Sequence, residues 1–185
     1  VKDKQYIKRN AFILFDRLVY ECIKGYWSGS SDSRISRSLT EQTVGDYFSS
    51  VSDEDWKKLI DDINNKGMID NNGIKDQSKL EPLVYYIHCL KGVASLNYVN
   101  GFDVDHIIPQ EAFKKPSVQE SDNVLENSLF NLELLPSEIN KKKKDNFYDD
   151  IWDSKLDTTE RNMCTNSSFF SSEEELRSTS KISSF

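Results

Sequence analysis

The sequence predicts an α+β fold that is mainly helical, and the order of its periodic segments is the main reason. Residues 1–99 carry three segments in which apolar residues recur at helical spacing. Two short apolar runs with β-like character follow at residues 102–108 and 129–135. A further helix is expected from Ser137, so the predicted order is helices first, then strand, loop, strand and helix.

The first predicted helix covers residues 5–24. Its apolar residues are too continuous for strict alternation, which favours a helix buried on most of its circumference. Gly25 is expected to end this helix, because glycine commonly follows the last helical turn. A polar, serine-rich loop is predicted over residues 28–38.

Two more helices are predicted before the strands. Residues 52–55, "SDED", have the character of a capping box with acidic residues in the first helical turn, and Gly67 is a stop signal. Residues 70–73, "DNNG", predict a turn. Ser78 is expected to cap a third helix whose apolar residues extend from Leu80 to Ala94.

The length of 185 residues suits one compact domain, or one domain with a small appendage. We predict a helical flanking region over residues 1–99, a strand–strand–helix core over residues 100–152, and a serine-rich, partly helical extension over residues 153–185. The chain begins with Val rather than Met, which is compatible with a piece of a longer protein.

The composition predicts a cytoplasmic protein without a membrane segment. No apolar run approaches the roughly 20 residues that span a bilayer, and the amino end, "VKDKQYIKRN", lacks a signal-peptide pattern. Cys22, Cys89 and Cys164 are far apart and odd in number. This argues against a disulfide framework and against a cysteine-ligated zinc, and suits a reducing compartment.

The formal net charge of −7 opposes general binding to polyanions. Any interaction with nucleic acid must therefore depend on a local basic cluster or on a metal ion. One basic run is present, Lys141 to Lys144. Four consecutive lysines point all round a helix, so only one or two of them can face a site, and the others are expected to be solvated.

Two segments carry the residues with chemical potential. The first is "GFDVDHIIPQ", in which Asp105 and His106 are adjacent on a predicted strand and so point to opposite faces. The second is "NLELLPSEINKKKK", in which Asn131 opens the next strand and Asn140 lies in the first turns of the following helix.

Together, these segments resemble the strand–strand–helix core of the HNH endonucleases. "DVDHIIPQ" is similar to the HNH segment of RNA-guided CRISPR effectors, and "LFNLELLPSEIN" resembles the carboxy-terminal HNH domain of GmrSD-type, modification-dependent restriction proteins. The resemblance covers about residues 100–152. It implies a ββα-metal core packed against flanking helices, and a metal-dependent DNA endonuclease of bacterial restriction or phage defence.

The resemblance also implies partners. The substrate would be DNA, including modified phage DNA, and an upstream nucleotide-hydrolysing or DNA-sensing part would accompany the nuclease. Pro136 and Ile139 stand where many HNH domains carry zinc-binding cysteines, so no structural zinc is expected. Phe130 stands where HNH domains of the GmrSD type often have glycine. This is a departure from the pattern on which the register of the second strand is predicted.

The chemistry of phosphodiester hydrolysis suits these residue types. His106 would be the general base, since an imidazole has a pKa of about 6.5. Asp105 and the side-chain oxygen of Asn140 would hold Mg²⁺, with Mn²⁺ as the alternative, because both metals prefer oxygen ligands. By analogy with the family, Asn131 would brace the loop and fix the tautomer of His106.

The remaining assignments are less specific. Lys143 and Lys144 are candidates for contacts with neighbouring phosphates. Asp103 shares a strand face with Asp105 and either approaches the metal through water or is solvent-exposed. The alternatives are that Asn140 is a surface residue of a helix, although its spacing favours metal ligation, and that Asn131 is a simple turn residue.

Other classes of function remain open. The same core could belong to a DNA-binding or protein-docking module that does not cleave, and the acidic balance of the chain supports that alternative. An RNA endonuclease is the third alternative, because RNA and DNA share the reacting phosphodiester.

Overall fold

The computed structural model describes residues 4–27, 32–33, 36, 49–75, 77–91, 101–114 and 126–179. Most of the predicted loop at residues 28–38 lies outside these ranges, as does Ala94. The described part of the chain is mainly helical with two small antiparallel sheets, which confirms the predicted α+β class. No helix within these ranges combines the length and the apolar composition that a bilayer crossing requires.

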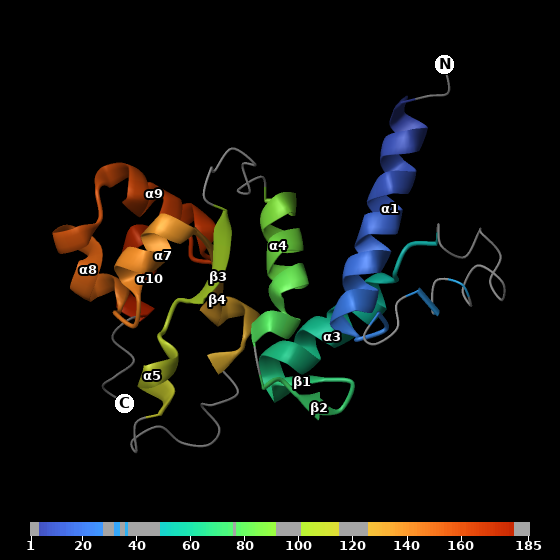
Figure 1. Cartoon of the computed structure of the whole chain (residues 1–185), viewed down its shortest axis with the longest axis horizontal. Coiled ribbons are helices and arrows are strands. Elements are labelled where there is room, and N and C mark those ends of the chain that lie inside the picture. The colour runs from blue at the N-terminus through green and yellow to red at the C-terminus, as the bar shows by residue number, and fades with distance from the viewer. Residues whose placement is uncertain are drawn as a thin grey trace.

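Helix α1 (Lys4–Ile23) projects from one end of the elongated molecule (Figure 1). The helix ends before Gly25 as predicted, and Gly25 has a φ of 71°. The prediction that α1 is buried on most of its circumference is wrong. Val19 and Ile23 are buried, whereas Phe12 and Phe15 are half-exposed, because only the carboxy-terminal half of the helix packs against the body.

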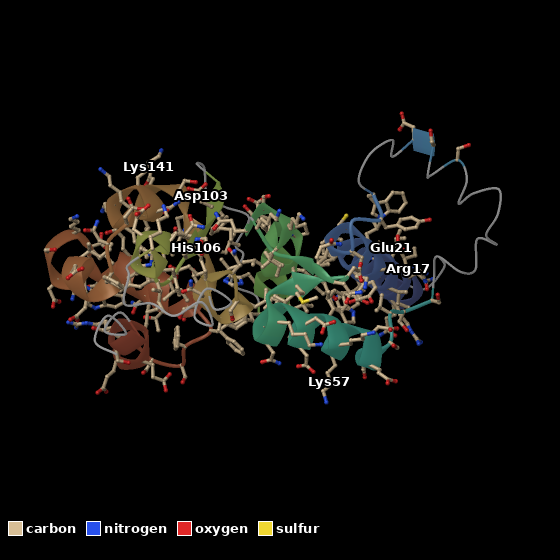
Figure 2. The ribbon with its side chains drawn as sticks, turned by 90° about the horizontal axis from the view of Figure 1, so that it is seen from below. Arg17, Glu21, Lys57, Asp103, His106 and Lys141 are labelled. Carbon is tan, nitrogen blue, oxygen red and sulfur yellow. The ribbon has the colours of Figure 1, made fainter. Side chains whose placement is uncertain are left out.

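Two charged residues of α1, Arg17 and Glu21, lie side by side in Figure 2. Arg17 Nε donates a 3.0 Å hydrogen bond to Glu21 Oε1, at the i,i+4 spacing that brings helical side chains together.

Helix α3 (Asp53–Lys66) begins and ends where the sequence predicts. The Ser52 hydroxyl accepts a 3.1 Å hydrogen bond from the backbone N–H of Asp55, and Gly67 closes the helix in the left-handed conformation, with φ of 58°. The predicted turn at residues 70–73 joins β1 (Met68–Ile69) to β2 (Asn72–Gly73).

The third helix is shorter than predicted. A 3₁₀ turn, η2 (Gln77–Lys79), precedes α4 (Glu81–Leu90). Leu80 rather than Ser78 stands at the N-cap, so the prediction that Ser78 caps this helix is wrong. Pro82 explains the shift, because a proline is tolerated in the first turn of a helix, where the backbone N–H has no helical partner.

A two-stranded sheet lies at the centre of the molecule. Strand β3 (Phe102–His106) pairs antiparallel with β4 (Leu132–Pro136), with Asp105 opposite Glu133 and His106 opposite Leu132. A short helix, α5 (Gln110–Phe113), follows β3. The 3₁₀ turn η4 (Leu129–Asn131) precedes β4, so Asn131 stands just before the strand that it was predicted to open.

The carboxy-terminal part forms four helices in the described range: α7 (Ser137–Lys143), α8 (Tyr148–Lys155), α9 (Thr158–Ser167) and α10 (Glu173–Thr179). Helix α7 begins at Ser137 as predicted, but it does not continue to Trp152. Lys144 leaves the helix with φ of 50°, and Asn146 Nδ2 donates a 2.6 Å hydrogen bond to the carbonyl of Lys143.

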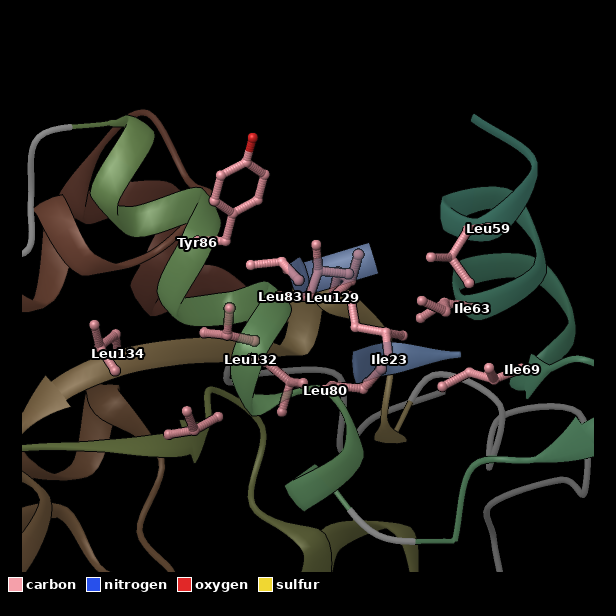
Figure 3. Close-up of a cluster of buried hydrophobic side chains, with 13 residues drawn as sticks. Ile23, Leu59, Ile63, Ile69, Leu80, Leu83, Tyr86, Leu129, Leu132 and Leu134 are labelled. Atoms are coloured by element: carbon pink, nitrogen blue, oxygen red, sulfur yellow. The ribbon is translucent and has the colours of Figure 1, made fainter. Parts of the chain in front are cut away.

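Two apolar clusters pack on opposite sides of the β3–β4 sheet. The first joins α1, α3 and α4 to the sheet, and Figure 3 shows its side chains converging from these elements. The second surrounds Trp152 and includes Cys164 of α9 and Leu176 of α10, both of which are fully buried. Burying one such large apolar side chain contributes roughly 1.5–3 kcal/mol, so the sheet is held from both faces.

The second histidine of the chain, His88 on α4, serves this packing. Its ring is fully buried, and Nε2 accepts a 3.3 Å hydrogen bond from the backbone N–H of Leu134 in β4. The same nitrogen lies close to the carbonyl of Ser167. His88 therefore lies in the core between α4, β4 and the end of α9.

Candidate functional site

The β3 strand presents different residues to its two faces. Val104 packs in the cluster on the α4 side, together with Leu132 and Leu134 of β4. Asp103 and Asp105 form hydrogen bonds with residues of α7 on the other side. The expected alternation therefore holds, and the carboxylate of Asp105 and the ring of His106 belong to opposite faces of the sheet.

The His106 ring is nearly buried, with 5% of the residue exposed. Its Nε2 lies 3.2 Å from the side-chain oxygen of Asn127, and Asn127 Nδ2 donates to the carbonyl of Ile74 at 3.4 Å. Because an amide oxygen can only accept, Nε2 carries the proton and the lone pair of the neutral ring is on Nδ1. Burial lowers the pKa of His106, against a smaller raising effect of the Asn127 hydrogen bond.

Asn131 braces the segment that follows β3, as predicted. Its Oδ1 accepts a 2.7 Å hydrogen bond from the N–H of Ile108, and its Nδ2 donates to the carbonyls of Ile108 and Glu126 at 3.2 and 2.9 Å. In the described residues, however, the ring of His106 is bonded to Asn127 and not to Asn131. The predicted influence of Asn131 on the ring is thus indirect. It acts through the hydrogen bonds of Asn131 with the backbone of Ile108, two residues after His106.

Asp105 is paired with a buried lysine. The ammonium of Lys143 donates to Asp105 Oδ2 at 2.6 Å and to the backbone carbonyl of His106 at 2.5 Å. The Lys143 side chain has no exposed surface, whereas 19% of the Asp105 side chain is exposed. Lys143 therefore holds the end of β3 against α7. Its ammonium does not face solvent, in contrast to the predicted contact of Lys143 with a phosphate.

Asn140 lies one helical turn before Lys143 and faces Asp103. Its Nδ2 donates a 3.0 Å hydrogen bond to Asp103 Oδ2, and the Ser137 hydroxyl donates to Asp103 Oδ1 at 3.0 Å. Two cross-links thus run in parallel between β3 and α7, Asp103 to Asn140 and Asp105 to Lys143. The structure brings the predicted metal ligands to the same strand–helix interface, although they do not bond directly to each other.

A third acid, Glu133, lies under this interface. It is fully buried on β4, and Tyr148 donates a 2.6 Å hydrogen bond to its Oε1. Lys143 Nζ is 3.9 Å from the same oxygen, and the ammonium lies 5.2 Å from the centre of the Tyr148 ring. Burial raises the pKa of Glu133 to about 8, although Lys143 and Tyr148 act in the opposite direction.

The other lysines of the basic run lie on the outside. Lys141 is exposed on α7, on the outer side of the helix in Figure 2, which also labels Asp103 and His106. Lys142 donates to Glu160 at 2.5 Å. Lys144 is exposed just past the helix end, so it remains a candidate for a phosphate contact.

The oxygen atoms at this interface fit a hard divalent cation. Within the described residues, no hydrogen bond uses Oδ1 of Asp105 or Oδ1 of Asn140. Among the residues that the structure describes, no three His, Cys, Asp or Glu side chains are grouped so that they could hold a metal ion together. An ion between Asp105 and Asn140 would have two protein ligands and several waters, as Mg²⁺ prefers. Asp103 and Asp105 carry two negative charges against the single positive charge of Lys143.

Sequence reasoning missed three residues of this site. Asn127 falls before the motif, in a segment that carries no periodic signal. Glu133 could have been noticed as the one charged residue in "LFNLELLP", because an acid inside an apolar strand is typical of a buried, bonded group. Tyr148 gave no signal, since its contact with Glu133 depends on how α8 packs.

Comparisons with known proteins returned no matching family model, no similar curated protein and no similar solved structure.

Proposed function

We propose that this chain is a metal-dependent endonuclease of HNH type that hydrolyses phosphodiester bonds in DNA. The observation that supports the proposal best is the arrangement of β3, β4 and α7. In this arrangement the Asp105 carboxylate and the Asn140 amide lie at one strand–helix interface, and the next residue, His106, ends β3 with its ring on the opposite face of the sheet. These are the residue types that hydrolysis of a phosphodiester requires.

His106 would act through Nδ1. Since Nε2 is bonded to Asn127, the ring has a fixed orientation and an available lone pair on the other nitrogen. A lowered pKa keeps the ring neutral at cellular pH, so it can accept the proton of an attacking water.

Asp105 and Asn140 would hold Mg²⁺ through their Oδ1 atoms. When bound, such an ion stabilises negative charge on the phosphate and on the leaving oxygen. Lys143 donates to Oδ2 of Asp105, and no hydrogen bond within the described residues uses Oδ1 of the same carboxylate.

A plasmid-nicking assay with Mg²⁺ or Mn²⁺ tests the proposal. The wild-type protein should nick supercoiled DNA, and His106→Ala should lower the rate about 10²- to 10⁴-fold, the usual contribution of a general base. Asn140→Ala should also lose activity, whereas Asn65→Ala, on an exposed part of α3, should retain it. Equal rates for His106→Ala, Asn140→Ala and the wild type would refute the assignment.

A second candidate is a DNA-binding or protein-docking module without nuclease activity. The Lys143 ammonium supports it, because this cation already forms an ion pair with Asp105, one of the two proposed metal ligands. Binding of DNA that is independent of metal, together with no turnover under any divalent ion, would favour this candidate. The same assay on a structured RNA would reveal an RNA endonuclease.

A further inference from the structure

We propose that Asp103 is a positioning residue that fixes which end of the Asn140 amide is presented to the metal. The inference rests on the proposed function, in which Asn140 is a metal ligand. The two ends of an asparagine amide have nearly the same shape but opposite hydrogen-bonding character. Only the oxygen end can coordinate Mg²⁺ or Mn²⁺, so the orientation of this amide decides whether Asn140 can serve as a ligand.

The contact with Asp103 determines this orientation. Asn140 Nδ2 lies 3.0 Å from Asp103 Oδ2. An ionised carboxylate only accepts hydrogen bonds, so the NH₂ end of the amide must face Asp103. The oxygen end is then directed away from Asp103, and no hydrogen bond in the described part of the chain uses it.

Asp103 is itself held in place and is not a ligand in this arrangement. Ser137 donates to its Oδ1 at 3.0 Å, and Asn140 occupies its Oδ2, so both oxygens already accept a hydrogen bond. Ser137 is the first residue of α7 and Asn140 lies three positions later, on the same side of the helix. The carboxylate thus bridges two positions of α7 that lie three residues apart, and it sets the position of the first turn of this helix relative to β3.

The contact can be altered without disturbing the rest of the site. Lys143 bonds to Asp105 and to the His106 carbonyl, and it does not contact Asp103. Asp103→Asn keeps the size of the side chain and can still bond to Asn140. It accepts through its oxygen or donates through its NH₂, however, so the Asn140 amide is no longer restricted to one orientation.

Binding of Mn²⁺ to the whole chain provides the readout, measured by the loss of the free-ion electron paramagnetic resonance signal. Asp103→Asn should weaken Mn²⁺ binding about 10- to 100-fold, as substitutions behind a metal ligand typically do. Its melting temperature should stay close to that of the wild type. Asp62→Asn is the matched control, because it removes the same charge from a carboxylate bonded to Lys66, on α3.

A double variant makes the test specific to amide orientation. Asp103→Asn combined with Asn140→Asp exchanges the two groups and keeps the net charge and the hydrogen bond between them. Position 140 then offers an oxygen at both ends, so Mn²⁺ binding should recover from the level of Asp103→Asn. The double variant also decides the question if Asp103→Asn alone fails to fold.

Each result separates this inference from the proposed function. Unchanged Mn²⁺ binding in Asp103→Asn would overturn the role of Asp103, as would a double variant that binds no better than Asp103→Asn. A wild-type protein that binds Mn²⁺ but cleaves no DNA would overturn the proposed function, while the binding constants would still decide the role of Asp103. A wild-type protein that binds no Mn²⁺ would overturn both.

Discussion

Lys143 and Asp105 form an ion pair across the interface of α7 and β3, with 2.6 Å between Nζ and Oδ2. The lysine is fully buried and also bonds to the backbone of His106. A buried ammonium is tolerated only where its donors are satisfied, and here a carboxylate and a carbonyl satisfy two of them. This pair connects the stability of the core to the geometry of the candidate site.

Lys143→Met should therefore destabilise the protein, whereas Lys144→Met should not. Removing one partner of a fully buried pair costs roughly 3–5 kcal/mol, and the partial exposure of Asp105 reduces the expected loss to about 2–3 kcal/mol. The exposed neighbour should change the free energy of unfolding by no more than about 0.5 kcal/mol. Urea unfolding measures both values. Equal stabilities of the two variants would contradict the buried position of Lys143.

Glu133→Gln should change how stability depends on pH. The raised pKa means that between pH 4.5 and about 8 the folded protein keeps a proton that the unfolded chain has lost. The contribution of Glu133 therefore falls as the pH rises through this window. Glutamine removes the effect, so the stability of the variant relative to wild type should increase from pH 5 to pH 8 by roughly 1–3 kcal/mol.

Unfolding in urea at several pH values measures this difference. Lys143, Asp105 and Tyr148 are the groups that act on the pKa of Glu133, and all three are kept in the variant. Glu54→Gln, at an exposed position in the first turn of α3, is the control for the loss of a carboxyl group at the surface. A constant difference for Glu133→Gln would show that Glu133 is ionised throughout.

Asn131→Ala should cost about 2–4 kcal/mol of folding free energy. The amide satisfies one backbone N–H and two carbonyls, and a buried polar group left without a partner costs roughly 1–3 kcal/mol. Asn65→Ala, at an exposed site on α3, should have little effect. Thermal or urea unfolding compares the two, and similar losses would mean that Asn131 is a simple turn residue.

The rate of DNA nicking should stay high to a pH below 6.5. A general base must be unprotonated, and burial lowers the pKa of His106 below that ordinary value. The acid limb of the pH–rate profile should therefore be centred below 6.5. Nicking rates between pH 5 and pH 8 at saturating Mg²⁺ measure it, and a midpoint at or above 6.5 would argue against His106 as the base.

Local signals in the sequence were sufficient for several elements. Ser52 and Gly67 set the limits of α3, because a cap depends only on neighbouring backbone groups. The alternation in "DVDH" placed Asp105 and His106 on opposite faces, since the period of a strand is a local property. The bracing role of Asn131, by contrast, was implied by the resemblance to HNH endonucleases, and its partners at Ile108 and Glu126 were not predicted.

Other features depended on packing between distant segments. The apolar content of α1 predicted burial on most of its circumference, yet Phe12 and Phe15 are half-exposed, because the helix is longer than the surface that covers it. The break after Lys143 was missed, because the run of lysines has a high helix propensity and the stop comes from a hydrogen bond of Asn146.

The sequence by itself determined the α+β class and the strand–strand–helix order, since both follow from periodicity along the chain. The choice of candidate site residues rested on the resemblance of two segments to HNH endonucleases. Only the tertiary structure decided which side chains pair across β3 and α7: Asp103 with Asn140, and Asp105 with Lys143. The physical reason is that the register between a strand and a helix is set by the burial of Leu135, Ile139 and their neighbours, which no local pattern specifies.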